Sequence, residues 1–169
     1  MITTTLKDIK AHEPCTCGWK KLLTGLDKKW ADSKPLPLET ILENNGLDDA
    51  LWALRAVDER YHPAMRLFAC YCAKYVLDIF EKEYPEDKRP RQAIDATEKF
   101  ARGEGSEEDL AAARDAAWAA AWDAAGAAAW DATWVAAWDD FKKEFIRLCR
   151  LEGEYGQVTN RKLRGTPCM

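Results

Sequence analysis

Apolar side chains recur at intervals of three and four residues along most of the chain, which is the spacing of one helix face. The most apolar stretch runs from Pro63 to Tyr84, and we expect the central core helix there. Shorter helices, bounded by capping residues, glycines and prolines, are predicted near residues 6–9, 16–25, 38–43, 48–61 and 90–103. Because no alternating strand pattern of useful length is present, the prediction is an all-α fold, a single-domain helical bundle.

The last helix has an unusual composition. Ser106 and Asp109 resemble a capping box and start a helix predicted over residues 106–150. Between residues 111 and 138 the chain has 16 alanines and five tryptophans, and alanine is the best helix former. The tryptophans follow a four-residue register in which Gly126 takes one place: Trp118, Trp122, Trp130, Trp134 and Trp138.

This register cannot stay on one stripe of a straight helix. Four residues advance the helix by about 400°, so the five tryptophans sweep roughly 200° around it. Three arrangements remain open: a break near Gly126, a bend with neighbouring helices wrapped around it, or two halves buried against different partners. In the third arrangement a second subunit covers part of the helix, so a homo-oligomer is one expectation. Packing against the rest of the same chain is the simpler one.

Length, charge and termini restrict the class of protein. A chain of 169 residues suits one helical domain over residues 1–150, followed by a tail over 151–169 that we expect to be mobile or ordered only on contact. With 47% hydrophobic and 32% charged residues it is predicted to be neither disordered nor membrane-spanning. A net charge of -4 argues against sequence-independent binding to nucleic acid. The first residues lack a secretory signal pattern, so we expect a cytoplasmic protein.

The cysteines are expected to be thiols rather than disulfides or metal ligands. Cys70 and Cys72 lie in the apolar helix, where cysteine usually behaves as a small hydrophobe. His12, Cys15 and Cys17 are close in sequence, but a structural zinc site needs four ligands and the chain supplies no second pair at a suitable spacing. We therefore predict no metal and no cofactor.

Catalytic patterns are also weak. The chain has no phosphate-binding glycine loop, no G-x-S-x-G and no H-E-x-x-H. His12 and His62 are both placed at predicted helix ends, and Asp58 with Glu59 and Arg55 is more typical of a solvated charge group than of an acid/base pair. The prediction is a protein that is not an enzyme.

Binding candidates are the tryptophans of the last helix and two smaller groups. Asp87 and Arg89 precede the helix that starts at Pro90, where they can cap and clamp helices or contact a ligand or partner. Trp52 and Arg55 lie one helical turn apart, with Arg66 further along, and tryptophan and arginine carry much of the energy of protein interfaces. Trp52 can equally belong to the core.

Several blocks of sequence resemble a known family. They are Gly18-Trp19-Lys20-Lys21-Leu22-Leu23 after Cys15, the continuous block at residues 41–57, Phe68-Ala69-Cys70-Tyr71-Cys72-Ala73, Asp87-Lys88-Arg89-Pro90, residues 100–104 and the Ala/Trp/Asp repeat. Together they make the chain similar to the phage and prophage immunity-protein family, which is related by sequence to immunity proteins of polymorphic toxin systems. The resemblance implies an α-helical protein with no established catalytic residues.

The leading hypothesis is thus a non-enzymatic, phage-derived immunity-type or anti-defence protein that binds another protein, either a toxin or a component of bacterial defence. A second hypothesis is an oligomer that encloses a signalling nucleotide between tryptophans and arginines. A third is an enzyme that uses the Asp/Glu/Arg cluster.

Overall fold

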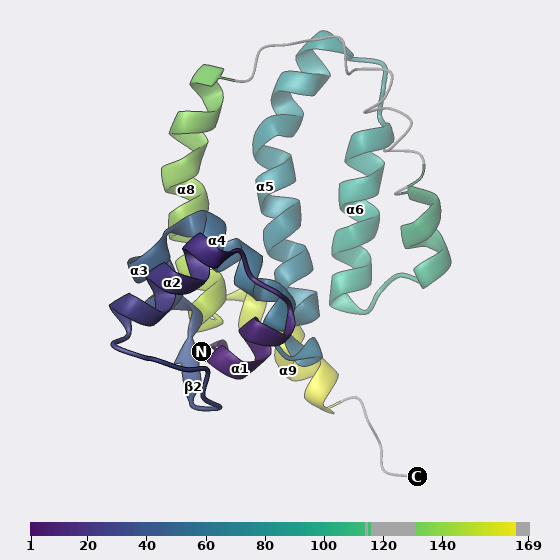
Figure 1. Cartoon of the computed structure of the whole chain (residues 1–169). Coiled ribbons are helices and arrows are strands. Elements are labelled where there is room, and N and C mark those ends of the chain that lie inside the picture. The colour runs from purple at the N-terminus through teal and green to yellow at the C-terminus, as the bar shows by residue number, and fades with distance from the viewer. Residues whose placement is uncertain (114, 116–130, 165–169) are drawn as a thin grey trace.

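Three long helices stand side by side in the computed structural model, which describes residues 1–113, 115 and 131–164 (Figure 1). Helix α5 (His62–Glu83) lies in the middle, with α6 (Arg89–Arg102) on one side and α8 (Asp131–Arg150) on the other. The all-α fold class is confirmed, and α8, with 20 residues, is a long helix in the C-terminal part of the chain. Every helix among the described residues is too short or too polar to cross a lipid bilayer.

The ends of the long helices follow local chemistry. Pro63 and Pro90 occupy the first turns of α5 and α6, where a missing N–H breaks no helical hydrogen bond. Helix α6 ends at Arg102, and Gly103 is its C-cap in the left-handed region, with φ of 75°. The capping box is present: the Asp109 amide donates to Ser106 Oγ at 3.1 Å, and the Ser106 amide donates to Asp109 Oδ2 at 3.4 Å. Residues 107–113 are helical after it.

A layer of short elements surrounds one end of α5 and α8 (Figure 1). It consists of β1 (Thr3–Thr5), α1 (Leu6–Ala11), α2 (Thr16–Gly25), β2 (Pro35–Pro37), α3 (Leu38–Asn45), α4 (Leu47–Ala53), and the 3₁₀ turns η1 (Leu54–Ala56) and η2 (Glu59–Tyr61). Helices α3 and α4 meet at Gly46, whose φ of 99° and ψ of 176° suit glycine and almost no other residue. This corner brings the two helices together around one side of the core.

Two details of this layer differ from the sequence prediction. Strands β1 and β2 form a small antiparallel pair in which Thr4 is opposite Leu36, although strands of three residues are too short to show alternation in sequence. The helix expected over 48–61 ends at Ala53 instead. Thr4 Oγ1 donates to the Ala56 carbonyl at 2.5 Å, and Val57 then continues in extended conformation with its side chain buried. The Ala56 carbonyl thus accepts a hydrogen bond from strand β1 instead of from a following turn of helix.

The core is centred on the face of α8 that meets α5. Phe145 and Leu148 are fully buried, and the ring of Phe68 on α5 packs edge-on against Phe145 with a centroid distance of 5.7 Å. Tyr71 and Tyr75 pack edge-on against Phe141 in the same way. Aromatic pairs of this geometry add to the stability that apolar burial supplies.

Part of the C-terminal segment, for which the sequence analysis expected a tail that is mobile or ordered only on contact, is helical and packed on the rest of the chain. Helix α9 (Glu154–Arg164) follows α8 after a turn, and its Tyr155 and Val158 are buried in the core between α5 and α8. Tyr155 also donates to Glu144 Oε1 on α8 at 2.6 Å. Tyr155 and Val158 lie one helical turn apart on the core-facing side of α9.

Part of the tryptophan register lies outside the described residues. This holds for Trp118, Trp122, Trp130 and Gly126, and for the side chain of Trp134. Trp138 is half-buried and packs against the core, as expected for a tryptophan on the core-facing side of α8. A break near Gly126 and an oligomer formed through the Trp-rich segment stay predictions.

Candidate functional site

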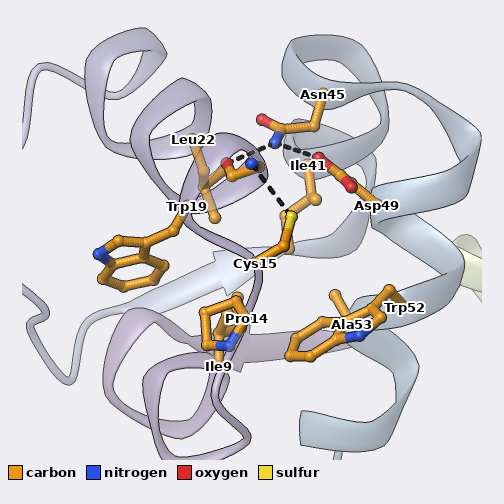
Figure 2. Close-up of a pocket in the computed structure, with 11 residues that line it drawn as sticks. Ile9, Pro14, Cys15, Trp19, Leu22, Ile41, Asn45, Asp49, Trp52 and Ala53 are labelled. Atoms are coloured by element: carbon orange, nitrogen blue, oxygen red, sulfur yellow. Dashed lines mark hydrogen bonds between the residues drawn. The ribbon is translucent and has the colours of Figure 1, made fainter.

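A small pocket lies where α1, α2, α3 and α4 meet (Figure 2). Its volume is about 90 Å³, whereas pockets that enclose organic ligands usually measure roughly 300–1,000 Å³. Its lining combines aliphatic side chains, the rings of Trp19 and Trp52, and the polar groups of Cys15, Asn45 and Asp49. The pocket therefore has room for one protruding side chain of a partner or a few water molecules, and not for a nucleotide.

A network of hydrogen bonds holds the polar side together. Asn45 at the end of α3 donates from Nδ2 to the Gly18 carbonyl at 2.9 Å and to Asp49 Oδ2 at 2.6 Å, and so connects α2 with α4. The helices approach so closely that a Cβ atom at position 18 would lie 2.8 Å from Asp49 Oδ2 and 3.2 Å from Cys15 Sγ. A larger residue at position 18 would therefore require the Asp49 carboxylate, the end of a flexible side chain, to move.

Cys15 is the N-cap of α2, one residue before the predicted start of the helix. Its Sγ atom accepts a hydrogen bond from the Gly18 amide at 3.3 Å and lies 3.2 Å from Cys17 Sγ. The bond from the Gly18 amide, and next the contact with Cys17, lower the pKa of the Cys15 thiol below its usual value, while the Asp49 carboxylate acts in the opposite direction. Cys15 thus has more thiolate character than an ordinary exposed cysteine.

Trp52 and Arg55 form one unit on the rim of the pocket. The Arg55 guanidinium lies over the Trp52 ring at 4.5 Å from its centroid, and Arg55 Nε donates to the Trp52 carbonyl at 3.1 Å. Trp52 is half-buried and Arg55 is exposed. The sequence left Trp52 as either a binding residue or a core residue. In the structure its ring packs against the core and also lines the pocket.

The other predicted residues are elsewhere. Arg66 packs on the Phe100 ring at 5.1 Å and belongs to the contact between α5 and α6. Asp87 accepts from the Arg89 amide at 3.0 Å and from Arg89 Nε at 2.9 Å, and this contact lowers the pKa of the Asp87 carboxyl. Its surroundings form a broad depression in the loop before α6. Neither group joins the pocket.

The connection between α5 and α6 involves residues that the sequence analysis overlooked. Arg91 Nε donates to Glu81 Oε1 at 2.7 Å, and Lys74 donates to Glu98 Oε1 at 2.7 Å. Within the described residues, no group of three or more His, Cys, Asp or Glu side chains is arranged to hold a metal ion.

The pocket itself was only partly foreseen. Trp52 was selected for its proximity to Arg55, and Cys15 was considered only as a metal ligand. Asn45 and Asp49 were missed because they lie on two helices whose closeness depends on the corner at Gly46. The one local signal was a polar residue at each end of that corner.

Comparison with known proteins gives one result. The family described as Imm-5 like putative immunity protein matches residues 55–138. The match supports assigning the chain to this immunity-protein family. The search of curated proteins and the search of solved structures each find no match.

The matched segment and the residues that line the pocket do not overlap. The match starts at Arg55 and includes Arg66, Asp87, Arg89 and the Trp-rich segment. The residues that line the pocket, from Ile9 to Ala53, all precede it. The matched segment covers α5, α6 and the residues that follow α6, while the pocket is formed by the helices before it.

Proposed function

We propose that this immunity-type protein is a non-enzymatic binder that attaches to another protein and neutralises it. The partner is a toxin or a component of a bacterial defence system, and the binder acts in the cytoplasm of a cell that carries a phage or prophage. Support comes from the immunity-protein family, whose members act on proteins, and from the lack of a catalytic motif in the sequence.

The observation that carries the proposal is the Trp52–Arg55 unit beside the pocket. A tryptophan held half-buried by the core loses little entropy when it binds, and an arginine stacked on it presents a planar donor to the partner. Asp48, one turn before Trp52 on α4, is exposed and adds a carboxylate beside the rim. An aromatic surface with both charge signs suits a protein partner that offers an apolar side chain for the pocket.

The size of the pocket favours a protein over a nucleotide. A volume of about 90 Å³ accommodates a side chain of a partner but not a nucleotide base with its ribose and phosphates. A nucleotide-binding oligomer would need the Trp-rich segment instead, most of which lies outside the described residues.

The test is co-purification of the tagged chain from its host, with mass spectrometry of the proteins and small molecules retained. We expect one protein to be retained by the wild type and largely lost with Arg55→Glu, because the reversed charge repels the group that Arg55 binds. Arg91→Glu is the matched control: it reverses an exposed arginine on α6 that is paired with Glu81, away from the pocket. Circular dichroism should show that both variants fold.

Three results would contradict the proposal. One is retention of the partner by Arg55→Glu to the same degree as by the wild type. Another is loss of the partner with Arg91→Glu but not with Arg55→Glu. The third is a nucleotide that copurifies in stoichiometric amount and raises the melting temperature of the pure protein by several degrees, which would favour the nucleotide-binding alternative.

A further inference from the structure

The sulfur atoms of Cys15 and Cys17 lie close together on an accessible surface. The two Sγ atoms are 3.2 Å apart, and both residues are exposed. A disulfide bond measures about 2.05 Å, so the sulfur atoms need to approach by only about 1.2 Å to bond. The pair is therefore placed for intramolecular oxidation without a change of fold.

The two sulfur atoms are not equivalent. Cys15 Sγ caps the N-terminus of α2 and accepts from the Gly18 amide, and the exposed amides at a helix N-terminus stabilise a thiolate. Cys17 lies inside the first turn of the same helix. Since the thiolate is the attacking species in disulfide exchange, Cys15 is the first sulfur to react and Cys17 the second.

The remaining described cysteines have the opposite character. Burial raises the pKa of Cys70 to about 11 and the pKa values of Cys72 and Cys149 to about 12. Cys70 and Cys149 are also inaccessible in the folded protein. Reactivity among the described thiols is thus concentrated at the start of α2.

We propose that Cys15 and Cys17 form a reversible thiol–disulfide site whose oxidant is a small-molecule disulfide of the oxidised glutathione class. The Cys15 thiolate attacks one sulfur of oxidised glutathione, forms a mixed disulfide and releases one glutathione thiolate, which takes up a proton from water. Cys17 then loses its proton, attacks Cys15 Sγ and displaces the second glutathione. The dithiol loses two electrons and two protons, and one oxidised glutathione becomes two reduced molecules.

The thiol–disulfide site at Cys15 and Cys17 is independent of the proposed binding to a partner protein. Its test therefore needs only the purified protein. The reduced full-length protein is incubated with oxidised glutathione and analysed by mass spectrometry, with Cys168→Ser as background because residue 168 lies outside the described part of the chain. We expect a product lighter by two hydrogens, with the bond mapped within a peptide that contains both Cys15 and Cys17. Dithiothreitol should restore the original mass.

Single variants establish the order of attack. Cys17→Ser should stop at a stable glutathione adduct on Cys15, whereas Cys15→Ser should form an adduct on Cys17 about fivefold more slowly or worse. Unfolding in urea should abolish this difference, because the cap that activates Cys15 exists only in the folded helix. The variants are expected to fold, since both positions are exposed.

Two outcomes would overturn the proposal. The first is a wild-type product that keeps glutathione and never closes to the internal disulfide. The second is equal reaction rates for Cys15→Ser and Cys17→Ser in the folded state, which would mean that the helix cap does not activate Cys15.

Discussion

The buried hydrogen bond between Tyr155 and Glu144 is the interaction whose removal tests the fold most directly. Tyr155 is 2% exposed and Glu144 is 8% exposed, and the Tyr155 hydroxyl donates to Glu144 Oε1 at 2.6 Å. Glu144 Oε2 accepts from Arg147 Nη1 at 2.9 Å. The bond therefore attaches α9 to α8 through a carboxylate that has one other charged partner.

Tyr155→Phe removes the hydroxyl and leaves the ring in place. A hydrogen bond to a charged group contributes about 1.5–3 kcal/mol, and the phenylalanine ring creates no large cavity. Because Arg147 still pairs with Glu144, the lower part of that range applies, and we expect the free energy of unfolding to fall by about 2 kcal/mol. With an m-value of about 2 kcal/mol/M, the urea midpoint should fall by about 1 M.

The assay is urea unfolding followed by tryptophan fluorescence, with hydrogen exchange of the α9 amides as a local readout. Tyr75→Phe is the matched control, since it removes a hydroxyl from a half-buried ring that packs on Phe141, and should cost less than about 0.5 kcal/mol. A double-mutant cycle with Glu144→Gln isolates the pair. If Tyr155→Phe is as stable as the wild type, the hydrogen bond does not hold α9, and apolar burial alone must account for its docking.

The same bond predicts a pH dependence. Burial, and then the hydrogen bond to Glu144, raise the pKa of Tyr155 in the folded protein above the value of about 10 that tyrosine has when unfolded. The unfolded chain thus loses this proton first, so the stabilisation is fully present below about pH 10 and decreases at higher pH. Between about pH 8 and pH 11 the wild type should lose more stability than Tyr155→Phe. Parallel losses in the two proteins would show that Tyr155 does not cause the effect.

Three further predictions concern other parts of the fold, each measured by urea unfolding. Gly46→Ala should lower the free energy of unfolding by about 1–3 kcal/mol through backbone strain alone, because a Cβ atom there meets no other atom within 4 Å. Gly46→Asn should be no more stable than Gly46→Ala. A Gly46→Ala variant as stable as the wild type would refute the idea that the corner is strained. Phe145→Ala should cost about 3–5 kcal/mol, because it empties a fully buried site beside Phe68, and a cost below 2 would mean that the core collapses into the space. Arg150 Nε donates to Glu39 Oε1 at 2.7 Å, although the two residues are 111 positions apart in sequence. Because exposed ion pairs contribute little, Arg150→Ala should change the urea midpoint only slightly. A large shift would show that this pair helps to hold α3 on α8.

Local sequence signals accounted for most of the helices. Pro63 and Pro90 started α5 and α6 as expected, and Ser106 with Asp109 formed the capping box. Gly46 separates α3 from α4, between the helices predicted over 38–43 and 48–61. These signals worked because each depends only on residues within about one helical turn.

The errors share a physical cause. Helix propensity favoured a continuous helix over 48–61, but the Ala56 carbonyl accepts from Thr4 of β1 and the helix ends early. The tail looked mobile by composition, but Tyr155 and Val158 are buried by surfaces of α5 and α8. In both places a contact between residues distant in sequence overrode the local preference.

The candidate site shows the same division. The pairing of Trp52 with Arg55 followed from their helical spacing, and the sequence brought Cys15 and Cys17 together only as neighbours in the chain. By itself, the sequence determined the helical class and most of the helix boundaries, because these depend on residue spacing and caps. Only the tertiary structure decided that α2 and α4 meet at Gly18, that Asn45 and Asp49 close the pocket, and that α9 docks, since each depends on packing between distant segments.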